Sequence, residues 1–406
     1  MPGINDKNSS DRILIIHTRG ICYYSGSFFL KQAMKAFRRK NIPVSYLELS
    51  GEDADWEQLA SLEGRKYRAI LDINSKLPYL TEDSEYGPLP LLDLIDAPFY
   101  NWIVDHPLYH HPGLSFRLKD YHVLTIDRSH AAYVRKYYPW IRTADYCPVP
   151  GFSARKRRFT DRNIDLLIPA TYLPHEKVNE EWNTVCDLLK ETPEGYSFRQ
   201  LLADVYDKWN PAEEPLEDAL FYVLTDRDLA PEDFGMNDLS VMMNYVYPVD
   251  RRVRYEYRLS CVRAAASSGT NCVIMGEGWD SADLEFNNIS FLPPVPIGNT
   301  YEVISNAKAV FDINPLFYCG MHDRVPSALL NGAGCMTTMS ESAEPELSSN
   351  KAVKICRDSD AIRRAAEDAS RLTEDEGEEI SELAYMTGEK FSWDGFADRF
   401  LKLLKA

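Results

Sequence analysis

Short apolar runs, separated by polar or helical segments, recur along most of the chain. The first, Arg12–His17, ends in the polar residues 18–20, which is typical of a buried parallel strand that leads into a loop. Ser27–Lys40 then carries apolar residues on one helical face and basic residues in its last turn. Similar apolar runs predict further strands at 44–49, 69–73, 99–104, 122–126, 164–168, 272–275, 289–292 and 309–313. This alternation predicts an α/β protein whose parallel sheets have helices on both faces.

The composition of the sequence changes near residue 150, where a proline-bounded stretch is followed by the basic run Arg155–Arg158. We therefore expect a first Rossmann-like domain over 1–155 and a second over 156–390. Acidic residues at helical spacing predict a helical insertion over 176–250, and 391–406 is an amphipathic C-terminal helix. Two such doubly wound domains are expected to face each other across a cleft, with ligands outside the carboxyl ends of the strands.

Composition narrows the class of protein. The 45 Lys and Arg residues against 62 Asp and Glu residues give a net charge of −17, which argues against binding nucleic acid or an anionic membrane by charge alone. The absence of a run of about 20 apolar residues predicts no integral membrane segment, and the polar start of the chain favours a cytoplasmic protein. Eight cysteines without a CxxC pair indicate neither a zinc site nor a disulfide framework. Three Asp-x-Asp pairs, at 53/55, 226/228 and 358/360, are expected to be solvated, so no metal site is predicted.

The most informative stretch is 311–334. A buried strand ends at Asn314, Gly320 permits close backbone approach, and His322 and Arg324 stand where a helix opens. Backbone N–H groups at a helix start favour phosphate, and an arginine adds a bidentate clamp, so this stretch predicts an anion site. The alternative, in which Asp323 is only an N-cap and Arg324 only a surface ion pair, stays open.

This stretch, together with 292–301 and 303–308 before it, resembles the GT-B glycosyltransferases of group-1 type, in particular the spore-maturation-protein-like branch. The segments 164–170, Arg254–Arg258 and Ile274–Trp279 are similar to comparable segments of that family. The resemblance covers about residues 160–340. The first domain is similar only at the level of fold.

The resemblance implies a metal-independent, hexosyltransferase-like enzyme that moves a sugar from a nucleoside diphosphate sugar to an acceptor hydroxyl. The donor would be bound by the second domain and a carbohydrate, protein or small-molecule acceptor mainly by the first, with no further cofactor. By position, the implied donor-binding residues are Arg254, Gly276, Glu277, Gly278, Gly298, Asn314, Gly320, His322 and Arg324. His322 and Arg324 would hold the diphosphate. Many relatives carry two glutamates seven residues apart where this chain has Gly320 and Ser327, so ribose contacts are expected elsewhere, with Glu277 as a candidate.

The first domain carries a second polar cluster, over 101–112. The strand that ends at Val104 would deliver Asp105 and His106, either of which could act as general base towards an acceptor hydroxyl. A metal site formed with His110 and His111 is disfavoured, because prolines at 107 and 112 interrupt the helix that would align them. A purely structural role for the pair is equally open. Asp127, after the next strand, is predicted to cap a helix.

Two other functions fit the same architecture. One is a nucleotide-sugar epimerase of the non-hydrolysing type, which also uses two such domains and a diphosphate site. The other is a non-catalytic module that binds a sugar or a protein, which the two missing glutamates leave open.

Overall fold

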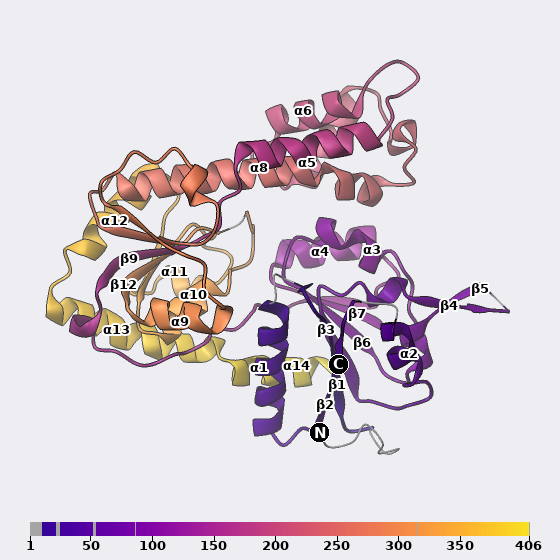
Figure 1. The fold of residues 1–406 in the computed structure, drawn as a ribbon, viewed down its shortest axis with the longest axis horizontal. Helices are drawn as coiled ribbons and strands as arrows, with labels where there is room; N and C mark the ends of the chain where they lie inside the picture. Colours follow the sequence, from indigo (N-terminus) through magenta and orange to yellow (C-terminus); the bar gives the residue numbers. More distant parts are fainter. Residues whose placement is uncertain (1–9, 22–24, 52–53, 86, 315, 406) are drawn as a thin grey trace. The chain divides into compact units, whose positions relative to one another are not determined.

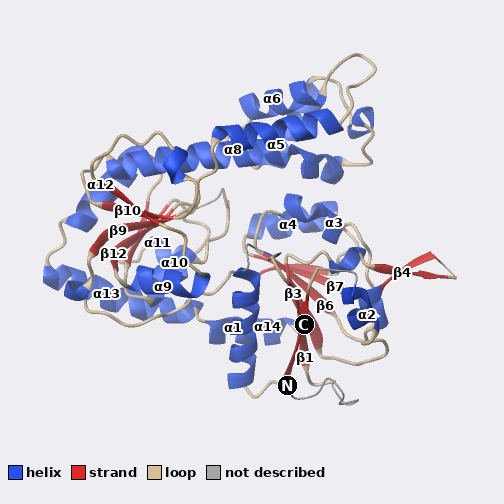
Figure 2. Ribbon diagram, viewed as in Figure 1, coloured by secondary structure: helices blue, strands red, loops and turns tan. Residues whose placement is uncertain are grey.

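The computed structural model describes residues 10–21, 25–51, 54–85, 87–314 and 316–405. It contains two compact units, each built on a six-stranded parallel sheet (Figures 1 and 2). Unit 1 comprises Met1–Phe152, Gly320–Leu330 and Met386–Ala406, and unit 2 comprises Ser153–Cys319 and Asn331–Tyr385. The predicted fold class, with two doubly wound sheets, a helical insertion and a C-terminal helix, is confirmed.

The sheet of unit 1 has the strand order β2-β1-β3-β6-β7-β8. Its strands are β1 (Ile13–Thr18), β2 (Val44–Leu49), β3 (Ala69–Ile73), β6 (Phe99–Ile103), β7 (Tyr121–Thr125) and β8 (Thr143–Tyr146). Every residue of β3, β6 and β7 is buried, because helices cover both faces of a parallel sheet, and these strands are therefore mostly apolar. A hairpin of β4 (Thr81–Ser84) and β5 (Gly87–Pro90) projects from the connection between β3 and β6.

The helices of unit 1 are α1 (Ser25–Arg39), α2 (Ala54–Ala60), α3 (His111–Leu114), α4 (Arg128–Tyr137), α10 (Arg324–Leu330) and α14 (Trp393–Leu403). The C-terminal helix α14 packs against α1 and β6 through aromatic rings. Phe396 stacks on Trp102 with ring centroids 4.7 Å apart, and Phe400 lies 5.4 Å from Phe37. All four rings are buried, so the last helix completes the core of this unit.

Unit 2 has the strand order β11-β10-β9-β12-β13-β14. Its strands are β9 (Ile164–Pro169), β10 (Cys272–Met275), β11 (Ile289–Leu292), β12 (Ala307–Asp312), β13 (Gly334–Thr337) and β14 (Val353–Ile355). Its helices are α5 (His175–Leu188), α6 (Phe198–Lys208), α7 (Leu216–Asp226), α8 (Leu239–Ala266), α9 (Ile297–Ser305), α11 (Pro345–Ser348), α12 (Ser359–Ser370) and most of α13 (Glu374–Gly388). The strand order reverses between β9 and β12, which is where ligands bind in open parallel sheets.

The insertion of unit 2 consists of α5, α6, α7 and the first half of α8 (Figure 1). The insertion was predicted to end at 250, but α8 runs without a break across this position, over 28 residues that include Pro248. Its first half buries Val246 and Val249 among the insertion helices, and its second half buries Cys261 and Val262 in the core of the sheet. Both halves therefore have apolar partners, which stabilises one continuous helix. No helix in the described part of the chain is both long and apolar enough to span a bilayer.

Candidate functional site

The carboxyl edge of the unit 1 sheet gathers polar groups from two neighbouring strands. Asn74 follows β3, and Asp105 and His106 follow β6. The Asn74 Nδ2 donates to Asp105 Oδ2 at 2.7 Å. The Asp105 side chain is 48% exposed, so its carboxylate is anchored by the edge and still open to solvent. This is the geometry that a general base towards an incoming hydroxyl requires.

The histidines beside Asp105 have different surroundings. His106 caps a short helix, because its Nδ1 accepts from the Leu108 N–H at 3.1 Å, and its ring lies edge-on against His130, 4.6 Å between centroids. His110 is only 10% exposed, and its Nε2 lies 3.8 Å from Asp105 Oδ2, beyond hydrogen-bond distance. The Asp105 carboxylate is thus the better placed of the two predicted bases, since the His106 ring is held by its own loop.

The predicted anion loop joins this same edge. Gly320 forms an antiparallel bridge with Asp127, which follows β7, and belongs to unit 1. A Cβ on Gly320 would overlap the carbonyl oxygen of Ile126, so glycine is required here by close backbone packing. Asp127 is the N-cap of α4, as predicted, because its carboxylate accepts from the Ser129 N–H at 2.6 Å.

His322, Asp323 and Arg324 form a connected group after Gly320. Asp323 Oδ1 lies 2.6 Å from His322 Nδ1, and Arg324 Nη2 lies 3.1 Å from His322 Nε2. Because an arginine can only donate, His322 Nε2 accepts and its proton is on Nδ1. Burial acts to raise the pKa of Asp323, but the neighbouring His322 and Arg324 outweigh it and the pKa is lowered. Helix α10 begins only at Arg324 and has seven residues, so the predicted anion site would depend on these side chains more than on the helix end.

The packing around α10 leaves no place for a glutamate at position 320 or 327. Ser327, at the second glutamate position, is fully buried, and its hydroxyl accepts from the Phe152 N–H at 3.3 Å. A Cβ on Gly151 would overlap the backbone of Pro326 and Ser327. Gly320, at the first position, has no room for any side chain. Both positions are filled by the packing of unit 1 itself, so neither can present a carboxylate to a ligand.

The carboxyl edge of the unit 2 sheet holds Gly276 and Gly278. Each adopts a positive φ, 155° and 84°, and a Cβ on either would overlap a carbonyl oxygen, of Ala170 or of Tyr172. Trp279 Nε1 donates to the Ala170 oxygen at 2.6 Å, and the buried Arg258 donates to the Thr171 oxygen. Close packing against residues 170–172 is therefore sufficient to explain why glycine occupies both positions.

The other sequence-predicted residues of unit 2 stand on four different segments of the chain. Arg254 pairs with Asp250 one turn earlier on α8 at 2.7 Å, with both side chains largely buried. Glu277 is exposed, and its carbonyl accepts from the Tyr172 N–H at 2.9 Å. Gly298 is exposed in the first turn of α9. Asn314 is buried at the end of β12, where its side chain accepts from the Phe317 N–H at 2.8 Å.

Asn314 opens onto a cavity of about 680 Å³ at the carboxyl ends of β12, β13 and β14. Its walls combine aromatic rings with hydroxyl groups and one ion pair, and include Tyr257, Phe317, Tyr318, 338–342 and Arg357. The Tyr318 hydroxyl donates to the Glu214 oxygen at 2.5 Å, so the insertion forms part of the wall. Arg357 pairs with Glu341 at 2.6 Å, with both side chains exposed. Sequence reasoning missed 338–342 and 355–357, because the strands before them were not predicted.

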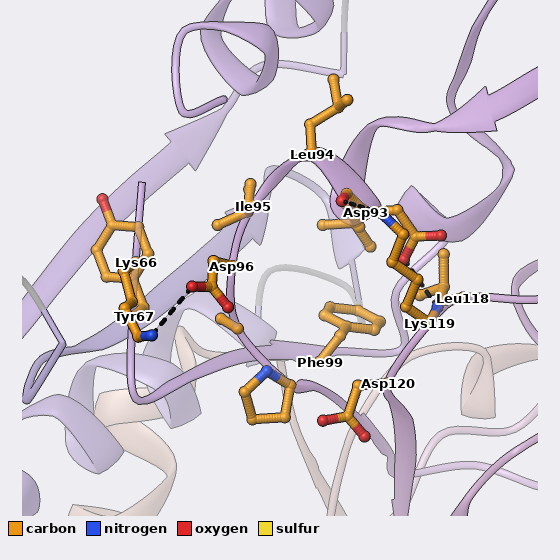
Figure 3. A pocket seen from close by; sticks show the side chains of 13 residues that line it. Lys66, Tyr67, Asp93, Leu94, Ile95, Asp96, Phe99, Leu118, Lys119 and Asp120 are labelled. Atoms are coloured by element: carbon orange, nitrogen blue, oxygen red, sulfur yellow. Dashed lines mark hydrogen bonds and ion pairs between the residues drawn. The ribbon is translucent and has the colours of Figure 1, made fainter. Parts of the chain in front are cut away.

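A second cavity, of about 480 Å³, lies at the amino ends of β6 and β7 in unit 1 (Figure 3). Lys66 pairs with Asp96 at 3.2 Å, the Asp93 carboxylate accepts from the Lys119 backbone N–H at 2.9 Å, and Lys119 Nζ donates to the Asp93 backbone oxygen at 3.1 Å. It is at the opposite edge of the sheet from Asp105, and ligands of such sheets bind at the carboxyl edge. We therefore assign it no part in the candidate site.

One expectation about the acidic pairs was wrong. Asp55 is buried, not solvated, and accepts from the Ser50 and Gly51 N–H groups at 2.8 and 2.5 Å. It closes the turn between β2 and α2. Its predicted pair member, Asp53, lies outside the described residues. Asp358 is the N-cap of α12. Within the described ranges, no three His, Cys, Asp or Glu side chains are grouped as metal ligands.

A buried carboxyl group below the unit 1 edge predicts a pH effect on stability. Burial raises the pKa of Asp72 to about 7, against the opposing hydrogen bonds from Ser75 and the Ile73 N–H. Since the folded pKa exceeds the unfolded value of 3.8, its stabilising contribution is complete below that value and is lost as the pH rises through 7. We expect Asp72→Asn to raise the free energy of unfolding by a few kcal/mol at pH 8, about 1.4 kcal/mol per unit of pKa shift, and to lose this gain at pH 4. Urea unfolding across this range measures it.

The control for that experiment is Asp96→Asn, at an exposed position. This variant is expected to show no such crossover with pH. A gain from Asp72→Asn that did not change between pH 4 and pH 8 would contradict the assignment.

Comparison with solved structures identifies the fold. The chain matches a DNA-modifying β-glucosyltransferase, solved with and without uridine diphosphoglucose, with a TM-score of 0.50 and 11% identity over 97% of this chain and 100% of that one. A structure of the T4 phage β-glucosyltransferase gives 0.50, 10% identity and the same coverage. An α-glucosyltransferase bound to UDP and a 13-mer DNA gives 0.51 and 10% identity over 97% and 100% of the two chains. No family model and no curated protein matches the sequence. With the two parallel sheets, these matches confirm a GT-B-type pair of Rossmann-like units, and the narrower branch stays a prediction.

Proposed function

We propose that this protein is a glycosyltransferase that moves a sugar from a nucleoside diphosphate sugar to an acceptor hydroxyl. The observation that carries the proposal is the match over the whole chain to two enzymes named as glucosyltransferases, one solved with uridine diphosphoglucose and one with UDP. Unit 1 adds an anchored, solvent-accessible carboxylate at its carboxyl edge, and unit 2 adds a cavity at its own. A general base and a donor pocket are the two parts that such a transfer needs.

The donor nucleotide is assigned to the cavity of unit 2. Its volume of about 680 Å³ falls within the range of small-molecule sites. Phe317 and Tyr318 offer faces for a base, and Ser340, Ser342 and Arg357 offer donors to a ribose or phosphate. His322 and Arg324 are kept as the diphosphate contacts, where the positive charge of Arg324 would stabilise the leaving group without a metal ion. UDP is the first nucleotide to test.

The acceptor step is assigned to Asp105. Its carboxylate takes the proton of the acceptor hydroxyl, whose oxygen attacks the anomeric carbon of the donor. The bond from that carbon to the diphosphate oxygen breaks, and the diphosphate leaves with the bonding electrons. Attack opposite the leaving group inverts the anomeric centre.

The charge distribution favours an acceptor that is not nucleic acid. Residues 176–250 contain 18 acidic and five basic residues, which accounts for most of the net charge of −17. A DNA backbone, such as that bound by the matched α-glucosyltransferase, would be repelled by this insertion. We therefore propose a carbohydrate, protein or small-molecule acceptor.

Nucleotide binding tests the donor assignment. We expect one of UDP, GDP, dTDP, CMP and ADP to raise the unfolding midpoint, by about 2.7 kcal/mol of stabilisation at a hundred times its dissociation constant, and EDTA to leave the effect unchanged. Arg324→Ala and Arg357→Ala should each weaken binding at least tenfold, measured by calorimetry. Arg371→Ala, which removes an exposed ion pair to Glu367, is the control and should bind as the wild type.

Two results would contradict the proposal. The first is a protein that binds none of these nucleotides, which favours a non-catalytic module. The second is conversion of the donor to an isomeric nucleotide sugar when no acceptor is present, which favours an epimerase.

A further inference from the structure

The side chain of Asn74 is held in a single orientation between β3 and β6. Its Oδ1 accepts from the Val104 N–H at 2.9 Å, and its Nδ2 donates to Asp105 Oδ2 at 2.7 Å. Because a backbone N–H can only donate, the carbonyl end of the amide must face Val104 and the NH₂ end must face Asp105. Asn74 is 4% exposed, so this arrangement is shielded from water on its own side.

The backbone of Asn74 is held as firmly as its side chain. Its φ is +46°, in the left-handed region that asparagine tolerates better than other residues with a side chain. Its N–H donates to the Trp102 oxygen at 2.9 Å, which fixes the turn after β3 to the last residues of β6. A strained conformation of this kind persists where the surroundings determine it, and such positions gather at functional sites.

We propose that Asn74 is a positioning residue for Asp105. Its Nδ2 hydrogen bond stabilises the ionised carboxylate and fixes the rotation of the side chain, so that Oδ1 takes the proton from the acceptor hydroxyl. This inference rests on the proposed function, in which Asp105 is the base. His110 Nε2 lies 3.8 Å from Oδ2, which is too distant for a hydrogen bond.

Asn74→Asp tests the contact with little change of shape. The new side chain keeps an acceptor for Val104 and tolerates the left-handed backbone, but it places a second carboxylate oxygen beside Asp105 Oδ2. Like charges at this distance should raise the pKa of Asp105 by about one to two units. The shift is measured by ¹³C NMR titration of aspartate-labelled protein, with the Asp105 signal identified by its loss in Asp105→Asn. The acid limb of the pH profile of kcat/KM should move by the same amount, with the donor KM unchanged.

Asn74→Gly separates the amide from the backbone. Glycine keeps the positive φ and removes both side-chain hydrogen bonds, so we expect kcat to fall about tenfold while nucleotide affinity is retained. The matched control is Asn41→Gly. Asn41 also has a positive φ, 59°, but is exposed at the end of α1. Its replacement should leave kcat and the Asp105 titration unchanged.

The outcomes distinguish this inference from the proposed function. An unchanged Asp105 pKa in Asn74→Asp, or wild-type kcat in Asn74→Gly, would overturn the positioning role. A raised Asp105 pKa without movement of the acid limb would overturn it too, because Asp105 would then not be the base. If the wild type transfers no sugar from any donor, the proposed function fails, and the inference that depends on it falls with it even where the NMR shift confirms the contact.

Discussion

Asp105→Asn is expected to lower kcat for sugar transfer by a factor of about 10² to 10⁴, the range that general base catalysis contributes. Asparagine has nearly the same shape but cannot take a proton from the acceptor hydroxyl. Its side-chain oxygen can still accept from Asn74 Nδ2, which donates to Asp105 at 2.7 Å in the wild type. The loss should therefore appear in kcat, with the dissociation constant of the nucleotide unchanged. Steady-state release of nucleoside diphosphate measures the first quantity and calorimetry the second.

The control for this variant is Asp96→Asn, the same substitution at the opposite edge of the unit 1 sheet. Asp96 pairs with Lys66 in an exposed position, and its replacement should leave both quantities unchanged. Undiminished turnover in Asp105→Asn would remove this residue as the base. Equal losses of kcat in the two variants would assign the effect to the removal of a charge in general.

Gly278→Ala is expected to have the largest effect on stability. The residue has a φ of 84°, and a Cβ would overlap the carbonyl oxygen of Tyr172. Strain in the backbone and overpacking each cost about 1–3 kcal/mol, so together we expect a loss of about 3 kcal/mol or more in the free energy of unfolding. Urea unfolding of the wild type and the variant measures this loss.

Gly269 provides a matched control within the same unit. Its φ of 80° is nearly that of Gly278, but a Cβ there would meet nothing within 4 Å. Gly269→Ala should therefore lose only about 1–2 kcal/mol, the cost of the left-handed conformation. If the two variants lost the same free energy, close packing against residues 170–172 would contribute nothing, and contact with a ligand would be the remaining reason for the glycine at 278.

Sequence reasoning located the strands that read as apolar runs, both those that are fully buried, such as β3, and those at a sheet edge, such as β11. β3, β10 and β11 have the predicted bounds, and β6, β7 and β12 differ by one or two residues at their ends. Of the strands it missed, β8 and β14 are edge strands, and β13 pairs between β12 and β14. β8 reads Thr-Ala-Asp-Tyr, β13 begins with a glycine, and β14 has only three residues. These segments are extended because they pair with a neighbouring strand, and the local amino-acid sequence gives little indication of that pairing.

The candidate site was predictable where a residue follows a recognisable strand. Asp105 was found in this way. Asn74 follows an equally clear strand, but its role depends on a partner 31 residues away, which no local pattern contains. Gly320 shows a second limit of prediction from sequence. The glycine indicates close backbone approach, but the sequence does not say which part of the chain approaches it. In the structure, the backbone of Ile126 and Asp127 occupies the space that a side chain at 320 would need.

Helix α8 joins the insertion to the sheet of unit 2 through one continuous helix instead of through flexible loops. At 1.5 Å per residue its 28 residues extend about 42 Å, and one half lies in the insertion while the other lies on the sheet of unit 2. Removing residues 176–250 would cut this helix in the middle and expose the cut end of the half that covers the sheet. The insertion is therefore not an exchangeable module. We expect the insertion to tolerate changes of length mainly at the turns between α5, α6 and α7. Helix α8 fixes the orientation of the insertion relative to the sheet of unit 2.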